Sequence, residues 1–186
     1  MYPHLPSDIT DFHTHNLQAQ HAIINAPQAW LQTPSLFLPR EGAYYSVGIH
    51  PWWSGDADFV RSMLQHLPTL LQHSQVIALG ECGLDALRGA PLDEQERIFC
   101  AQIEMAEAYQ LPVTLHIVRA YDYLLRLKKQ LRSTTQWTVH GFRGKPALAQ
   151  QLLQAGIDLS FGKRHNAESW NITPENRRWH ETDDDF

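Results

Sequence analysis

The stretch Asp93–His116, with the sequence DEQERIFCAQIEMAEAYQLPVTLH, decides the fold predicted for this chain. It begins with Asp93 as an N-cap and Glu96 three residues later, a capping-box pattern, and the helical pattern continues to Tyr109. The apolar run Pro112–Leu115 follows and ends at a histidine. Such a short apolar run is typical of a strand buried on both faces of a parallel sheet. A helix that leads directly into a buried strand indicates an α/β protein.

The same alternation recurs on both sides of this stretch. Three further helical patterns are Asp56–Gln72, Tyr121–Leu131 and Lys145–Ala155. The first is expected to break at Pro68, the last to end at Gly156, and the proline-rich Pro27–Gly42 to form a loop. The other apolar runs, interpreted as strands, are Ile9–His13, His21–Ala26, Tyr44–Ile49, Val76–Leu79, Trp137–Val139, Ile157–Phe161 and Arg178–Thr182. Eight strands predict one domain over 1–186, a TIM-type (β/α)8 barrel trimmed so that loops replace some helices.

The composition is that of an ordinary globular protein with many histidines. The chain has 186 residues, 43% of them hydrophobic, 11 histidines and a formal net charge of −5. A protein that binds nucleic acid through its general surface charge is usually basic. A phosphate-bearing substrate would therefore have to be held locally, by metal ions or a few cationic side chains.

The chain carries no sequence signal for export or membrane insertion. Cys82 and Cys100 are too few for a disulfide framework, which favours a reducing, cytoplasmic compartment. Met1-Tyr2-Pro3-His4 lacks the basic segment and apolar stretch of a signal peptide. The apolar runs are too short to span a bilayer, so no membrane partner is expected.

Six histidine or acidic side chains fall at the ends of predicted strands. They are His13, His15, Glu81, His116, His140 and Asp183. Alternate side chains of a strand share a face, so His13 and His15 point the same way. Parallel strands bring their carboxyl ends to one face of a barrel. Imidazole and carboxylate together suit zinc, manganese or similar divalent ions, and Glu81 could bridge two of them.

Each of these residues also has a structural interpretation. A lone histidine at a strand end is more often structural or solvent-facing than a ligand, and Glu81 could cap a helix or form a salt bridge. Asp183 begins a run with Asp184 and Asp185 that could be a solvated tail. The coincidence of these residues at the ends of five separate predicted strands favours the metal site.

Seven motifs occur in a characteristic order over nearly the whole chain. They are Asp11–His15 (DFHTH), Gly48–Pro51 (GIHP), Gly80–Asp85 (GECGLD), Gln95-x-x-x-Phe99-x-x-Gln102, Leu111–His116 (LPVTLH), Val139–Gly144 (VHGFRG) and Glu181–Asp183 (ETD). In this order they resemble the TatD family of metal-dependent hydrolases. The resemblance implies a TIM barrel, two divalent metal ions (Mg, Mn or Zn), and cleavage of phosphoester bonds in DNA, often from the 3′ end.

The resemblance also implies which residues hold the two ions. His13, His15, Glu81 and Asp183 would hold one. Glu81, His116 and His140 would hold the other, so that Glu81 is shared.

The chain departs from the family pattern in four places, one of which is a very short loop between the first two predicted strands that leaves no room for a first helix. Arg119 follows His116 by three residues where the family has an arginine two residues on, and Gly141–Gly144 replaces Phe-Ser-Gly after His140. The sequence ends three residues after Asp183, where relatives continue through another helix. We therefore expect the last helix of the barrel to be missing; the chain is a shortened member or a C-terminal tail is absent from the sequence.

The predicted chemistry is hydrolysis of a phosphoester, most simply by a 3′–5′ exonuclease-like deoxyribonuclease. Asp183 would act as general base and Glu81 would bridge the ions. His50, Arg119, Arg143 and Lys163 are candidate phosphate contacts, although each basic group could equally be a solvated surface charge. Trp52 and Trp53 could stack a base or pack under the barrel rim.

Two alternatives remain open at this stage. One is a hydrolase of the wider amidohydrolase superfamily that acts on an amide, ester, lactone or phosphotriester. Such enzymes commonly bridge their metals with a lysine, and Glu81 stands at the corresponding position. The other is a non-catalytic metal-binding relic, against which the six intact ligand positions argue.

Overall fold

The computed structural model describes residues 5–183. The expectation of no signal peptide rests on residues 1–4, and the acidic tail at Asp184 and Asp185 was the alternative to a ligand role for Asp183. Both segments lie outside the described residues. Within residues 5–183, no helix combines the length and apolar character that crossing a membrane requires.

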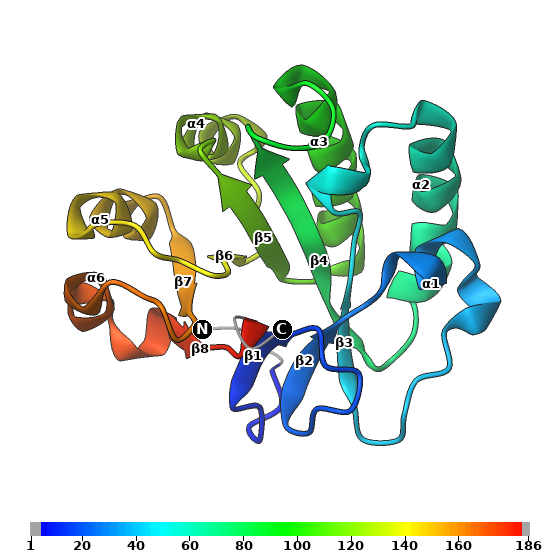
Figure 1. Cartoon of the computed structure of the whole chain (residues 1–186), viewed down its shortest axis with the longest axis horizontal. Helices are drawn as coiled ribbons and strands as arrows, with labels where there is room; N and C mark the ends of the chain where they lie inside the picture. The colour runs from blue at the N-terminus through cyan, green and yellow to red at the C-terminus, as the bar shows by residue number, and fades with distance from the viewer. Residues whose placement is uncertain (1–4, 184–186) are drawn as a thin grey trace.

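Eight parallel strands form one sheet in simple chain order, which confirms the predicted barrel (Figure 1). They are β1 (Asp11–Thr14), β2 (Ala22–Asn25), β3 (Tyr44–Val47), β4 (Val76–Asp85), β5 (Val113–Val118), β6 (Trp137–Val139), β7 (Ile157–Phe161) and β8 (Arg178–His180). All eight predicted strands are present. The main difference is β4, which runs six residues beyond the predicted end at Leu79 and so includes Glu81 and Asp85.

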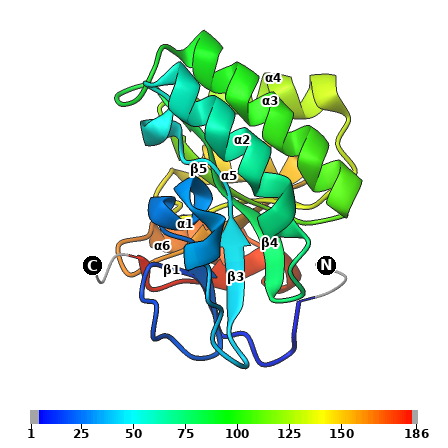
Figure 2. The same ribbon diagram turned by 90° about the vertical axis from the view of Figure 1, so that its right-hand side faces the viewer.

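The helices pack outside the strands. They are α1 (Gln28–Gln32), α2 (Ala57–Leu71), α3 (Leu92–Tyr109), α4 (Tyr121–Leu131), α5 (Pro146–Gln154) and α6 (Ala167–Ile172), with 3-10 turns η1 (Pro34–Leu36), η2 (Pro51–Trp53) and η3 (Glu175–Arg177). Figures 1 and 2 show α2 and α3 side by side against β4. Among the described residues, no helix joins β1 to β2 and none follows β8, as expected of a trimmed barrel.

Three local predictions about the helices are wrong. The helix α2 continues through Pro68, because Met63, Leu67 and Leu70 are buried on both sides of it and this packing outweighs the lost backbone hydrogen bond. The predicted loop Pro27–Gly42 contains α1 and η1, and Leu31 of α1 is fully buried.

The third error concerns the capping box at Asp93. The residue before α3 is Pro91, with no side-chain cap, and Asp93 lies in the first turn. The buried amide of Gln95, in the same turn, bonds to the preceding loop instead. Its Nε2 donates to the backbone oxygens of Asp85, Arg88 and Ala90 at 2.9, 2.9 and 2.7 Å. Gln95 therefore ties the start of α3 to the end of β4.

The barrel closes between β1 and β8 through side chains. The backbone N–H and hydroxyl of Thr182 donate to the carboxylate of Asp11 at 3.1 and 2.6 Å. Below them Trp179 stacks on Phe12, with ring centroids 5.4 Å apart. These contacts join the first and last strands without help from a covering helix.

The apolar core divides into two clusters. The larger one fills the layer between strands and helices, and the smaller one comprises Phe12 and Ile23 with the half-buried Leu5, Ile9, Ile77 and Trp179. Ile23 stands two residues before Asn25, whose amide reaches Glu81, and side chains two apart on a strand share a face. The smaller cluster, the apolar plug, therefore fills one end of the barrel interior. Polar side chains occupy the other end of the barrel.

The end of α3 supplies a prediction about stability. The Glu107 carboxylate accepts hydrogen bonds from the Ser133 and Thr134 hydroxyls and from the Thr134 and Thr135 N–H groups, at 2.5 to 3.0 Å. Burial alone would raise the pKa of Glu107, but these bonds outweigh it and lower the pKa to about 2. Glu107→Gln should lower the free energy of unfolding at pH 7 by about 1 kcal/mol, a value reduced for solvent screening.

The pH dependence has a definite sign. A carboxyl with a depressed folded pKa stabilises the fold above its unfolded pKa, near 4.5, and loses this effect as pH falls toward 2. Urea unfolding of both proteins between pH 7 and 3.5 should therefore show the difference shrinking as pH falls. A constant difference over this range would rule out the charged hydrogen bonds as its source.

Candidate metal centre

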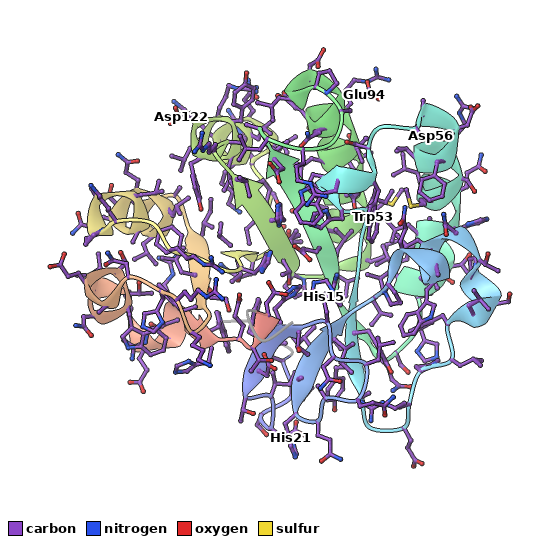
Figure 3. The ribbon with its side chains drawn as sticks, in the orientation of Figure 1. His15, His21, Trp53, Asp56, Glu94 and Asp122 are labelled. Carbon is purple, nitrogen blue, oxygen red and sulfur yellow. The ribbon has the colours of Figure 1, made fainter. Side chains whose placement is uncertain are left out.

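The carboxyl ends of β1, β4, β5, β6 and β8 converge on one group of side chains at the end of the barrel opposite the apolar plug. It contains all six residues that the sequence singles out, His13, His15, Glu81, His116, His140 and Asp183. Figure 3 shows His15 near the centre of the ring of strands. Residues separated by up to 170 positions meet here because parallel strands end on the same face.

Glu81 lies at the centre of the group, and its two oxygens face different histidines. Oε2 lies 3.5 Å from His13 Nε2 and 3.4 Å from His15 Nε2. Oε1 lies 3.0 Å from His116 Nδ1 and 2.7 Å from His140 Nε2. This division is the arrangement that a carboxylate shared by two ions would have.

The orientation of Glu81 is set by a residue that the sequence did not single out. Its backbone N–H donates to Asn25 Oδ1 at 2.9 Å, and Asn25 Nδ2 donates back to Oε2 at 3.4 Å. Asn25 is itself held by the Ser46 hydroxyl, at 3.2 Å. Burial would raise the pKa of Glu81, but the charge of His140 and the hydrogen bond from His116 outweigh it and hold the pKa well below its ordinary value. Glu81 is thus a buried carboxylate anion surrounded by polar side chains.

The chemistry of the donor set fits divalent ions. His13 is fully buried, and neither of its ring nitrogens makes a hydrogen bond within residues 5–183. An imidazole left without partners in a protein interior is costly unless something else satisfies it. Its Nε2 points at two carboxylates, Glu81 and Asp183, at 3.5 and 3.7 Å. A cation among these atoms would satisfy the imidazole and neutralise the acids.

Asp183 occupies the more open side of the group. Its Oδ1 lies 3.3 Å from His15 Nε2, and its Oδ2 lies 3.9 Å from His140 Nδ1. The side chains of Asp183 and His15 are 26% and 45% exposed, whereas that of Glu81 is 3% exposed. Asp183 and His15 therefore form the face of the group that water can reach.

His50 lies inside the group, although the sequence suggested only a phosphate contact. Its Nε2 is 3.1 Å from Glu81 Oε1, and its Nδ1 accepts the backbone N–H of Trp52 at 3.1 Å. A neutral ring whose Nδ1 accepts carries its proton on Nε2, so His50 donates to Glu81. Gln102 fixes the backbone next to His50, because the side-chain amide of Gln102 pairs with both the N–H and the C=O of Ile49, at 2.6 and 3.1 Å.

The other predicted substrate contacts lie on the rim of the same face. Arg119 directly follows β5, lies in the left-handed region with φ of 50°, and is exposed. Arg143 and Lys163 are exposed in the loops after β6 and β7. The two tryptophans differ, because Trp53 packs against the core while Trp52 is 42% exposed. The interpretation as rim packing holds for Trp53 alone.

Trp52 is held at the rim by two contacts. Its indole N–H donates to Asp85 Oδ2 at 2.6 Å, and the Arg88 guanidinium lies 3.6 Å from its ring centroid. Its ring lies edge-on to His50, with centroids 4.7 Å apart. A flat cationic and aromatic surface therefore adjoins the acidic and histidine group.

Comparison with known proteins gives consistent matches. The family model described as TatD related DNase matches residues 5–184. A Klebsiella pneumoniae protein named 3′-5′ ssDNA/RNA exonuclease TatD is 33% identical over 122 residues, which are 64% of this chain and 46% of that protein. The uncharacterized metal-dependent hydrolase YjjV of Escherichia coli is 31% identical over the same shares. The matched region thus spans about half the length of these relatives.

Solved structures match the fold over nearly the whole chain. The crystal structure of Escherichia coli YjjV, a TatD homologue, superposes with a TM-score of 0.77 over 95% of this chain and 79% of its own, at 24% identity. A TatD family hydrolase from Entamoeba histolytica gives 0.72 over 97% and 75%, at 18% identity. At these identities the likeness concerns the barrel alone.

Proposed function

The chain belongs to the TatD-related DNase family, and from this premise we propose that it is a divalent-metal-dependent phosphoesterase that removes nucleotides from a 3′ end of single-stranded DNA. The observation that carries the proposal is the division of Glu81, whose Oε2 faces His13 and His15 while its Oε1 faces His116, His140 and His50. The names of the matched relatives, an ssDNA/RNA exonuclease and a metal-dependent hydrolase, support the substrate class.

The proposal places two ions around Glu81, as the division of its oxygens supports. His13, His15, Glu81 and Asp183 would hold one ion, and Glu81, His116 and His140 would hold the other. Ions bound there would supply Lewis acidity, which activates water and offsets the charge that develops on phosphorus. Imidazole and carboxylate ligands accept Mg, Mn and Zn alike.

The side chains around the proposed ion positions have separate roles in hydrolysis. Asp183, on the water-accessible side, accepts the proton of the attacking water as its oxygen bonds to phosphorus. The P–O bond to the leaving nucleotide breaks, and the leaving oxygen takes a proton from solvent. The cations of Arg119 and Arg143 hold phosphate oxygens, and the Trp52 ring with its Arg88 neighbour supports a base. His50, whose Nε2–H is donated to Glu81, orients that carboxylate and does not contact the phosphate. Local cations suffice even though the whole chain is acidic.

A substrate panel tests the proposal. Purified protein is incubated with 3′- and 5′-labelled single-stranded DNA, a phosphodiester reporter, a phosphotriester, and esters and amides, with Mg, Mn and Zn in turn. We expect metal-dependent shortening of DNA from the 3′ end and none from amides. Turnover of amides or triesters but not DNA would favour the wider superfamily, and stoichiometric metal binding without any turnover would favour a non-catalytic protein.

The same assay distinguishes the two acids at the end of the sequence. Asp183→Ala should lower the rate by roughly 10³-fold or more, because it removes both a ligand and the general base. Asp185→Ala, at a position outside the described residues, serves as its matched control and should change the rate less than about threefold. Equal losses from both variants would contradict the assignment of Asp183.

A further inference from the structure

Asp85 is a buried carboxylate directly behind His116. It is 2% exposed, and its Oδ2 lies 3.2 Å from His116 Nε2, while the other ring nitrogen, Nδ1, faces Glu81. The same Oδ2 accepts the indole N–H of Trp52 at 2.6 Å, and Oδ1 accepts the N–H of Leu87 at 2.8 Å. His116 therefore lies between two carboxylates, one central and one behind it.

The backbone of Asp85 is fixed as firmly as its side chain. Its N–H donates to Gln95 Oε1 at 2.7 Å, and its carbonyl accepts from Gln95 Nε2 at 2.9 Å. Gln95 is buried in the first turn of α3. The hydrogen bonds to Gln95 therefore fix Asp85 relative to a long helix rather than to a surface loop. Through Asp85 they also fix the ring of His116.

Glu181 stands in the same relation to His140, with the ring nitrogens exchanged. His140 presents Nε2 to Glu81, and its Nδ1 faces Glu181 Oε1 at 3.6 Å, just beyond hydrogen-bond distance. Within the described residues this Nδ1 has no hydrogen-bond partner. Glu181 is 6% exposed and is held by the N–H of Gly141, at 2.7 Å to Oε1. A small approach of the ring would complete the contact.

Within the described part of the chain, no carboxylate is hydrogen-bonded to the second ring nitrogen of His13 or His15, on the other side of Glu81. Among residues 5–183, the ring of His13 makes no hydrogen bond, and Asp11 binds only its backbone N–H, at 3.3 Å. His15 has a side chain that is 45% exposed. The two ion positions that share Glu81 therefore differ in how firmly their ligands are held.

We propose that Asp85 and Glu181 are positioning residues that fix the rings of His116 and His140, so that the ion position formed with Glu81 Oε1 binds its ion more tightly than the position formed with Oε2. A carboxylate that accepts the second ring N–H fixes the tautomer and makes the ligating nitrogen more basic. Loss of such a partner typically lowers metal affinity about 10- to 100-fold. The inference rests on the metal site proposed above.

Calorimetric titration of the metal-free protein with Zn²⁺ tests the inference. The wild type should bind two equivalents in two steps. Asp85→Asn and Glu181→Gln should each weaken the tighter step about 10- to 100-fold and leave the weaker step within about threefold. Asp93→Asn, at an exposed position in the first turn of α3, and Glu107→Gln, which is expected to lower stability away from the site, should leave both steps unchanged. Weakening of the looser step alone, or of both steps equally, would overturn the inference.

A spectroscopic readout separates this inference from the proposed activity. In ¹⁵N–¹H spectra of the histidine rings of the zinc-loaded protein, His116 should show a slowly exchanging proton on Nε2, and Asp85→Asn should abolish its protection. His140 should show the corresponding proton on Nδ1, sensitive to Glu181→Gln. Unchanged ring signals in both variants would refute the positioning roles. These signals are measured without any substrate, so failure of DNA hydrolysis leaves this test intact.

Discussion

Replacing Glu81 by glutamine is expected to lower metal-dependent hydrolysis by roughly 10³-fold or more, because one side chain serves both ion positions. The Glu81 oxygens lie within 3.5 Å of His13, His15, His116 and His140. Glutamine keeps the size of the side chain but removes its charge and replaces one oxygen with a donor. An amide N–H₂ facing imidazoles cannot hold a cation, so binding of at least one equivalent should be lost.

Initial rates and metal titration of the same preparation check this expectation. Glu104→Gln provides the matched control, because Glu104 is an exposed glutamate of α3 far from the strand ends. Circular dichroism should show that both variants fold. Activity of Glu81→Gln within tenfold of the wild type at saturating metal would contradict a shared role for this carboxylate.

Replacing Gly83 by alanine should have the largest effect on folding. Gly83 has φ of +144°, a conformation that side-chain-bearing residues rarely adopt, and it pairs with His116 in the β4–β5 ladder. An added Cβ would lie 2.0 Å from the backbone oxygen of His116. Because the obstacle is backbone, β5 would have to move. We expect a loss of about 3 kcal/mol or more in the free energy of unfolding.

Movement of β5 should also change the candidate metal site, because Glu81 and Asp85 belong to β4 and His116 belongs to β5. Urea unfolding and Zn²⁺ titration of Gly83→Ala should therefore both change. Gly55→Ala is the control, because a Cβ there meets nothing within 4 Å; its unfolding free energy should stay within about 0.5 kcal/mol of the wild type. Equal stability of the two alanine variants would show that the backbone at Gly83 is not constrained as described.

Much of the fold follows from local patterns that the sequence displays openly. Each of the eight strands coincides with a predicted apolar run, and α3 and α4 lie within one residue of their predicted ranges. The errors arise where a distant partner outweighs a local signal. Burial keeps α2 helical through Pro68, and α3 begins after Pro91 without the side-chain cap expected of Asp93, while the amide of Gln95 holds its first turn to the preceding loop.

The candidate site also contains residues that the sequence predicts and residues that only the structure identifies. Strand-end position alone selected His13, His15, Glu81, His116, His140 and Asp183, and the structure brings these six together. Asn25, Asp85 and Glu181 were not selected as supports, although Asp85 and Glu181 lie within motifs quoted for the family resemblance. A carboxylate that meets a histidine from a different strand leaves no periodic signal in the chain.

The order of strands and helices, and the face of the barrel on which the polar residues gather, were therefore determined by the sequence, because both depend on backbone periodicity and on strand direction. Only the tertiary structure decided which oxygen of Glu81 faces which histidine, that His50 donates to Glu81, that Asp85 lies behind His116, and that Thr182 closes the barrel on Asp11. These contacts join residues up to 171 positions apart. Their distances depend on the register between neighbouring strands and on the packing of α3, which no local pattern specifies.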